Sequence, residues 1–536
     1  MVEIRVDKTA SRGIAIAPAY LYQEPDLTPD HYVVDKDQIE QEEERFGEVK
    51  RAVLAELEQL AQENPIFAAH LAIADDFTLQ EGVLGRIRSG EKNVQQAIAE
   101  TVEEVAAIFG QMDDEYMRER KADVLDIGKR FLIKCKNIKV QDLAAIQEPV
   151  IVVARDLFPS DTVKMNPEYV KGILTQEGGV TSHVSIMAKN YGIPALTGVT
   201  GILEKVQNGN RICMDAKSGK IVVEPEESVL AEYKKLLEEE VKEQENIRKY
   251  RFMEPVTSDG KRISLCVNVG NTEEIKLALD KNIDGVGLFR TEFLYMENNH
   301  FPTEEEQFAV YKEAANLCPK EVTIRTLDIG GDKSLPYYEF DPEENPFLGW
   351  RAIRISLDMP ELFKTQLRAI LRASVFGHIR IMFPMMISLK ELAQAKAITE
   401  ECKEELRREG IPFDENIETG MMMETPASVL LAEEFAKEAD FFSIGTNDLT
   451  QYILAVDRGN KKIASRYDSF HPAVLKAIEM IIQAGHKYNR KVGMCGELAG
   501  DVNAVHKLLQ LGLDEFSMSA GNVDYVRKAV MDEAQR

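Results

Sequence analysis

Long apolar stretches are absent from this chain of 536 residues, in which no uninterrupted run approaches the ~18 residues that a membrane-spanning helix requires. Cysteine is scarce: the six cysteines are scattered and no two form a CxxC pair, which argues against a disulfide-bonded secreted scaffold and against a zinc ribbon. The first five residues, MVEIR, lack the basic and then apolar segments of a signal peptide. Together these absences predict a cytoplasmic protein.

Positive charge is also in short supply. The chain has 65 lysines and arginines against 91 aspartates and glutamates, a net charge of −26. Because nucleic acids and anionic membranes bind positive surfaces, we expect neither as a partner, whereas a basic protein could dock on the acidic surface. With 44% apolar and 29% charged residues, the composition is that of a globular protein with several cores.

Patterns of hydrophobicity divide the chain into four parts. Short β runs and turns predict a β/α domain formed by residues 1–27 and 141–225. Between these segments, residues 28–140 carry apolar residues at helical spacing and acidic runs such as 40–44, which indicate either a solvated helix face or a docking surface for a cationic partner. Residues 226–254 are highly charged and contain neither glycine nor proline, which predicts a helical linker.

The fourth part, residues 255–536, shows a regular alternation. Short β runs, each followed by helical sequence, occur at 263–268, 285–289, 322–327, 379–383, 420–423, 441–444, 491–494 and 515–518. Eight such units over this length are typical of a TIM (β/α)8 barrel, so we predict a multidomain α/β protein with a C-terminal barrel. Catalytic residues of such barrels lie at the carboxyl ends of the strands.

Polar side chains stand at these predicted strand ends. Guanidinium forks bind phosphate or carboxylate, and the candidates are Arg290 and Arg325 at the second and third strands and Arg458 beyond the sixth. Glu424 after the fifth strand and Asp448 after the sixth can share one Mg²⁺ ion. Taken singly, each residue could be a surface ion pair or a helix-capping acid, but their convergence favours a site for a small, doubly anionic, phosphate-bearing substrate.

Two further groups are candidates for chemistry. Cys495 follows the seventh strand and is either a small buried core residue or a proton donor at the rim. His183 follows two glycines and the pair Thr181-Ser182, either of which can cap the helix that begins near the histidine. Backbone N–H groups at a helix start favour an anion, so His183 is either a structural histidine or a nucleophile that accepts phosphate, and its context favours the nucleophile.

Five segments, 178–188, 287–292, 327–333, 444–452 and 494–497, resemble the signatures of enzyme I of the bacterial phosphoenolpyruvate:sugar phosphotransferase system. The resemblance covers nearly the whole chain. It implies that phosphoenolpyruvate phosphorylates His183, that the group passes to a histidine of the phosphocarrier HPr, and that pyruvate is released, as the first step of sugar uptake. It also implies that the helical domain 28–140 docks HPr and that the barrel forms a homodimer. Because one imidazole cannot react with both partners from one pose, we expect the β/α phosphohistidine domain to swivel.

The resemblance also assigns roles by position. Arg290 and Arg325 would bind the substrate phosphate, Arg458 and Asn447 the rest of phosphoenolpyruvate, Glu424 and Asp448 Mg²⁺, while Cys495 would protonate the enolate and Thr162 would orient the histidine ring.

Three alternatives are disfavoured. Pyruvate phosphate dikinase and phosphoenolpyruvate synthase share the histidine domain and barrel, but they carry an ATP-grasp domain, and no glycine-rich nucleotide loop precedes residue 141 here. A nitrogen-type enzyme I would add an N-terminal sensory domain. A regulatory scaffold would bind HPr without catalysis, although every expected catalytic residue is present. The chain stops at Arg536, where family members usually continue with further helix, and this bears on stability and dimer packing.

Overall fold

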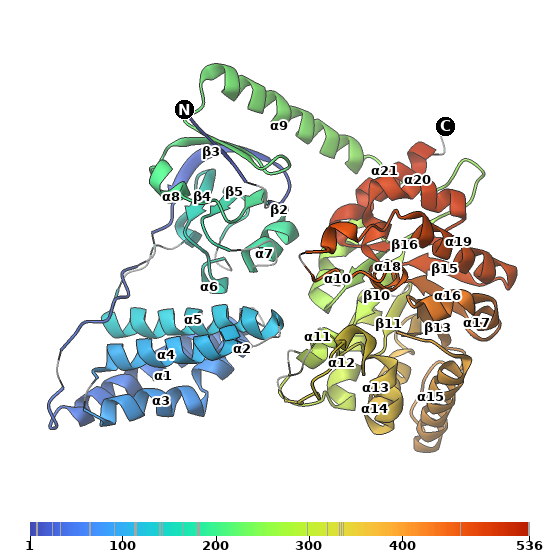
Figure 1. Cartoon of the computed structure of the whole chain (residues 1–536), viewed down its shortest axis with the longest axis horizontal. Helices are drawn as coiled ribbons and strands as arrows, with labels where there is room; N and C mark the ends of the chain where they lie inside the picture. Colours follow the sequence, from blue (N-terminus) through green and yellow to red (C-terminus); the bar gives the residue numbers. More distant parts are fainter. Residues whose placement is uncertain are drawn as a thin grey trace. The chain divides into compact units, whose positions relative to one another are not determined.

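Two compact units, Met1–Gln244 and Glu245–Arg536, make up the computed structural model of the chain (Figure 1). The structure describes every residue except 7, 8, 24, 33, 64, 65, 91, 112–114, 139, 140, 142, 163, 164, 179–182, 297, 319, 332, 334, 336, 461 and 534–536. No helix in the described part of the chain is long and apolar enough to cross a membrane.

An eight-stranded sheet forms the centre of the first unit, with strand order β1-β8-β7-β3-β4-β5-β6-β2. The strands are β1 Val2–Arg5, β2 Thr9–Ser11, β3 Ile14–Leu21, β4 Val150–Ala154, β5 Val170–Thr175, β6 Ala195–Leu196, β7 Arg211–Asp215 and β8 Lys220–Val223. Strands β3 to β6 run parallel, and the other pairings are antiparallel. Since β3 pairs with β4, segments far apart in the chain form one sheet.

The segment between β3 and β4 is helical. Its helices are α1 Ile39–Glu63, α2 Ile66–Ala74, α3 Phe77–Arg88, α4 Val94–Gln111 and α5 Glu115–Lys136. They share one apolar core, which includes Leu57, Phe67 and Phe131. One member of the acidic run 40–44 is neither solvated nor available to a partner: Glu42 is buried and accepts a hydrogen bond of 2.8 Å from the N–H of Val94, at the start of α4.

The remaining helices of this unit are α6 Pro159–Thr162, α7 His183–Tyr191, α8 Ile202–Lys205 and α9 Glu227–Arg248, with a 3-10 turn η1 at Leu143–Ala145. Helix α9 is not isolated from the sheet, because Leu230 and Tyr233 pack against Ile14, Cys213 and Val222. The first turns of the charged helix therefore belong to the core of the first unit.

The second unit is a closed barrel of parallel strands, which confirms the predicted TIM barrel. Its strands are β9 Ser264–Val269, β10 Gly285–Arg290, β11 Val322–Arg325, β12 Ile379–Phe383, β13 Glu418–Met423, β14 Phe441–Ile444, β15 Lys491–Met494 and β16 Glu515–Met518. The third strand is shorter than predicted. It ends at Arg325, and the N–H of Leu327 donates to the Gln366 side chain instead of to a neighbouring strand.

Helices surround this barrel, as Figure 1 shows. They are α10 Thr272–Ala278, α11 Glu292–Met296, α12 Glu304–Leu317, α13 Ile353–Asp358, α14 Pro360–Ala373, α15 Leu389–Glu409, α16 Pro426–Leu430, α17 Ala432–Glu438, α18 Thr446–Leu454, α19 Pro472–Lys487, α20 Val502–Leu511 and α21 Val523–Glu533. Short 3-10 turns are η2 Leu279–Lys281, η3 Pro346–Leu348, η4 Ala464–Arg466, η5 Glu497–Gly500 and η6 Ala520–Asn522. Strands and helices share one apolar core, in which Phe289, Leu367 and Phe442 are buried.

Candidate active site

The carboxyl ends of the barrel strands gather the residues that the sequence singled out. Arg290 and Arg325 are the last residues of β10 and β11, and Glu424 directly follows β13. Asp448 lies in the first turn of α18, which follows β14. Cys495 directly follows β15. Because all strands of the barrel run parallel, these positions lie at one end of it.

Three of the predicted residues join one buried network of charges. Arg325 reaches Asp328 (3.0 Å), and Arg351 lies between Asp328 (2.9 Å) and Asp448 (3.1 Å). Arg351 contacts Oδ2 of Asp448, and Arg458 lies 3.3 Å from the other carboxylate oxygen, Oδ1. The structure therefore brings Arg325, Asp448 and Arg458 together through two residues, Asp328 and Arg351, that the sequence analysis did not select.

Glu292 and Lys333 complete this network. Glu292 Oε1 accepts hydrogen bonds from Arg325 (2.6 Å) and from Lys333 (3.0 Å). Glu292 and Asp328 come just after strands β10 and β11, so the strand-end signal that selected Glu424 could have found them. Arg351 lies in the irregular segment between β11 and α13, where no strand marks it.

Glu424 is the least solvated carboxylate of the predicted metal pair. Its side chain is buried, and Oε1 accepts a hydrogen bond from the N–H of Met385 (2.7 Å). A Cβ atom at Gly445 would lie 2.8 Å from Glu424 Oε2, so glycine at this position lets α18 begin close to the carboxylate. Burial, and then the charges of Asp448 and Asp328, raise the pKa of Glu424 to about 8.

A divalent cation fits this environment. Burial is the largest cause of the raised pKa of Glu424, and the negative charges of Asp448 and Asp328 add to it despite the nearby guanidinium groups. Asp448 Oδ1 is buried and accepts no hydrogen bond from the described residues. Arg458 Nη1 lies 3.3 Å from this oxygen, as an ion pair and not a hydrogen bond. Two carboxylates from neighbouring strand ends suit Mg²⁺, which takes one or two protein carboxylates and keeps other oxygens in its shell.

Cys495 lies inside the end of the barrel, not exposed at its rim. It packs with Leu288, Met382, Met422 and Phe441. Burial raises the pKa of its thiol to about 11, so the sulfur keeps its proton at neutral pH. This is the protonation state that a proton donor needs.

Arg290 and Asn447 occupy different surroundings. Arg290 is half-buried and forms no ion pair with the described part of the chain, which leaves its guanidinium available for an anion. The amide oxygen of Asn447 already accepts the N–H of Glu497 (3.0 Å), and its backbone oxygen accepts the hydroxyl of Tyr467 (3.0 Å).

The histidine centre is only partly within the described residues. Helix α7 begins at His183, at the helix start that the sequence predicted. The imidazole and the two cap candidates, Thr181 and Ser182, lie outside what the structure describes. Thr162 is buried at the end of α6, which packs against α7.

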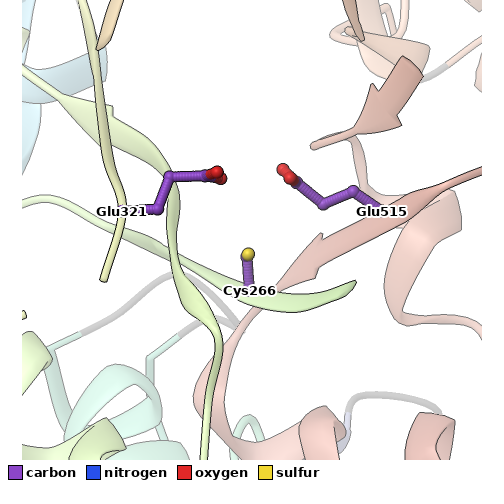
Figure 2. A group of neighbouring side chains, drawn as sticks. All are labelled: Cys266, Glu321 and Glu515. Carbon is purple, nitrogen blue, oxygen red and sulfur yellow. The ribbon is translucent and has the colours of Figure 1, made fainter. Parts of the chain in front are cut away.

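A second group of possible metal ligands lies at the opposite end of the barrel. Cys266 of β9, Glu321 before β11 and Glu515 at the start of β16 have ligand atoms within 4.8 Å of one another, and Figure 2 shows the carboxylates pointing toward each other above the thiol. Both carboxylates are already paired, Glu321 with Arg380 (2.6 Å) and Glu515 with Lys491 (2.6 Å). Mg²⁺ prefers oxygen ligands to a thiolate, so this cluster, whose carboxylates are already paired with cations, is not its site.

Comparisons with known proteins agree with this geometry. Family models described as "PEP-utilising enzyme" match the chain with their PEP-binding domain over residues 244–535, their N-terminal part over 8–120 and their mobile domain over 146–219. "Phosphoenolpyruvate-protein phosphotransferase" of Staphylococcus carnosus (strain TM300) is 42% identical over 97% of this chain and 92% of that protein. Proteins of the same name from Bacillus sp. (strain S) and Geobacillus stearothermophilus are 44% and 43% identical, over 96% and 98% of this chain and 90% and 93% of their own lengths. The resemblance stated from the motifs is thus confirmed, and the chain belongs to the phosphoenolpyruvate-protein phosphotransferase family.

Proposed function

We propose that this chain transfers the phosphoryl group of phosphoenolpyruvate to its own His183 and then to a histidine of the phosphocarrier HPr, with release of pyruvate. The observation that carries this proposal is the charge network that joins the buried Arg325 and Asp448 to the partly exposed Arg458, with Glu424 beside it, at the carboxyl ends of the barrel strands. A network that combines guanidinium groups with carboxylates suits a phosphate ester bound together with a divalent cation.

The arginines and Asn447 bind and orient the substrate. Arg290 and Arg325 hold the phosphate, and Arg458 with Asn447 holds the enolate and carboxylate end. The Nε atom of Arg325 is buried without a hydrogen-bond partner among the described residues, so this guanidinium keeps a donor for the ligand. Fixed donors of this kind stabilise charge in the transition state without reorganisation.

Glu424 and Asp448 would hold Mg²⁺, which when bound would offset negative charge on the phosphate and enolate oxygens. Transfer breaks the bond between phosphorus and the enolate oxygen and forms a bond between phosphorus and an imidazole nitrogen of His183. The enolate left behind takes a proton at C3 from the thiol of Cys495, which gives pyruvate. Water then returns a proton to the sulfur.

HPr docking is assigned to the helical segment α1–α5. The many acidic residues of the chain favour a basic partner, but Glu42 takes no part because it is occupied at the start of α4. We also assign a homodimer contact to the barrel unit. Sedimentation velocity of the intact chain at several protein concentrations tests whether the chain dimerises.

The decisive experiment is mass spectrometry of the protein after incubation with phosphoenolpyruvate and Mg²⁺, without ATP. We expect one phosphoryl group on His183, and its loss when HPr is added. The matched control is His183→Ala, which should take up no phosphoryl group. A requirement for ATP, or equal labelling of His183→Ala, would overturn the proposal.

A further inference from the structure

Asp328 is the middle member of a chain of alternating charges that crosses the candidate site. One carboxylate oxygen, Oδ2, lies 3.0 Å from Arg325 Nη1, and the other, Oδ1, accepts a hydrogen bond of 2.9 Å from Arg351 Nη2. The same Nη2 of Arg351 donates to Asp448 (3.1 Å). Asp328 therefore connects the candidate phosphate ligand Arg325 to the candidate metal ligand Asp448.

The surroundings of Arg351 make the link between Arg325 and Asp448 depend on the negative charge of Asp328. Arg351 is buried, and in the described part of the chain its carboxylate partners are Asp328 and Asp448. Its other neighbours, the hydroxyl of Tyr452 (3.2 Å) and the ring of Phe347, carry no negative charge at neutral pH. If Asp328 lost its charge, Asp448 would be the one ion-pair partner left to the buried guanidinium among the described residues, and the attraction of Asp448 for a cation would fall.

We propose that Asp328 is a positioning residue for phosphoryl transfer. Its Oδ2 holds Arg325 in place for the phosphate, and its Oδ1 takes up part of the charge of Arg351, so that Asp448 keeps the negative charge a metal ion needs. This proposal rests on the function proposed above. Residues that orient the ligands of a metal site commonly change metal affinity or activity by about 10- to 100-fold when they are replaced.

Asp328→Asn tests the proposal, because it keeps the shape of the side chain and removes its charge. The first readout is the dissociation constant for Mn²⁺, measured by calorimetry without phosphoenolpyruvate, which we expect to rise about tenfold. Asp524→Asn is the matched control, since Asp524 is also a buried aspartate that pairs with an arginine of this unit (Arg251, 2.6 Å). It should leave Mn²⁺ binding unchanged.

The Arg351→Met background separates positioning from a merely structural role. Without the guanidinium, Asp328→Asn should change the Mn²⁺ dissociation constant by less than about twofold, because effects that act through one shared partner are not additive. Wild-type affinity in Asp328→Asn, or an undiminished effect of that substitution in the Arg351→Met background, would overturn the proposal.

Asp328→Glu covers the case in which Asp328→Asn does not fold. It keeps the charge but moves the carboxylate by one methylene, so Mn²⁺ binding should stay within about threefold of wild type while labelling of His183 by phosphoenolpyruvate slows at least about tenfold. Labelling at the wild-type rate would refute the positioning role. Failure of the proposed function is recognised separately, since the wild type would then bind Mn²⁺ but acquire no phosphoryl group.

Discussion

For the activity of this site, we expect the planar shape of the Arg325 guanidinium to matter more than its positive charge. Its two terminal nitrogens contact different carboxylates, Glu292 at 2.6 Å and Asp328 at 3.0 Å, and Nε has no hydrogen-bond partner among the described residues. A lysine keeps the charge but presents one ammonium group in place of this fork. We therefore expect Arg325→Lys to lower kcat/KM for phosphoenolpyruvate by about 100-fold or more, the size of effect seen when one preorganised donor is lost.

The matched control for this prediction is Arg262→Lys. Arg262 also contacts two carboxylates, Glu254 and Asp284, each at 2.6 Å, but it is half-exposed and remote from the strand ends that carry the site. Steady-state rates of pyruvate formation should be near normal in Arg262→Lys. A normal rate in Arg325→Lys would make Arg325 a structural ion-pair residue instead.

The role proposed for Cys495 predicts that its replacement slows one half-reaction, pyruvate formation, and not the other, transfer to HPr. The thiol is buried and its pKa is raised to about 11, so it is protonated and can act once phosphoryl transfer leaves an enolate. Cys495→Ala should slow pyruvate formation by about 10²- to 10⁴-fold, as expected for the loss of a general acid. Transfer from preformed phosphohistidine to HPr should be unchanged, because that step involves no enolate.

Rapid-quench kinetics of each half-reaction measure this separation. Cys318→Ala, which replaces another buried cysteine of the same unit, is the control for a small cavity and should leave both steps unaffected. Equal slowing of both half-reactions in Cys495→Ala would contradict the assigned role.

At the scale of elements, the sequence predicts the barrel strands but not the course of the irregular segments that connect them to the helices. The run 379–383 is predicted as a strand and forms β12 over the same residues, because apolar residues in a fully buried parallel strand give a continuous signal. The positions of the candidate site residues next to strands could be predicted for a related reason: a parallel barrel collects all its carboxyl strand ends. Their roles stay predictions. Arg351 was missed because it lies in an irregular segment, where only the folded structure shows that it reaches Asp448.

Charge runs were a weaker signal than strands. The run 40–44 was interpreted as either solvated or partner-binding surface, yet Glu42 is buried against the start of α4. Glu42 accepts a hydrogen bond from the start of α4 only because α1 and α4 pack together, and the sequence of α1 alone does not predict this packing.

The amino ends of the barrel strands carry a pH-dependent contribution to stability. Burial, and then the charge of Glu515, raise the pKa of Glu321 to about 7, although Arg380 and Lys491 act against this. For Glu515 burial also acts to raise the pKa, but Lys491 and Arg380 outweigh it, and that pKa is lowered. Glu321 is therefore the member of the pair that holds a proton near neutral pH.

The sign of the effect follows from proton binding. Between about pH 4.5 and 7 the folded chain keeps a proton on Glu321 that the unfolded chain has released, so the free energy of unfolding falls as pH rises through this window, by at most about 3 kcal/mol. Glu321→Gln cannot titrate, so its melting temperature should fall less between pH 5 and 7, as calorimetry can measure. Glu438→Gln, an exposed glutamate at the end of α17, is the control and should behave as the wild type. The same pH profile for Glu321→Gln and wild type would refute this account.

At the scale of the whole molecule, the two chemical centres lie in different units. His183 begins α7 in the first unit, and Glu424 and Asp448 belong to the barrel of the second. The boundary between the units falls at residue 244, inside α9, and the first turns of that helix pack on the sheet of the first unit. The end of α9 and the segment that follows, up to β9, thus form the covalent connection between the units.

The last prediction is a change in the distance between the units on substrate binding. Phosphoryl transfer requires reacting atoms within about 3–3.5 Å, so His183 cannot serve both the barrel and HPr from one arrangement. All six native cysteines are buried, so spin labels should react selectively with Tyr191→Cys on α7 and Leu430→Cys on α16, two positions whose native side chains are exposed.

In a His183→Gln background, where transfer cannot occur, pulsed electron resonance should show that phosphoenolpyruvate with Mg²⁺ increases the population of short distances between the two labels, and that HPr decreases it. Pyruvate alone is the control ligand, because it lacks the phosphate that we propose Arg290 and Arg325 hold. Identical distance distributions under all conditions, with an active wild type, would exclude the domain motion.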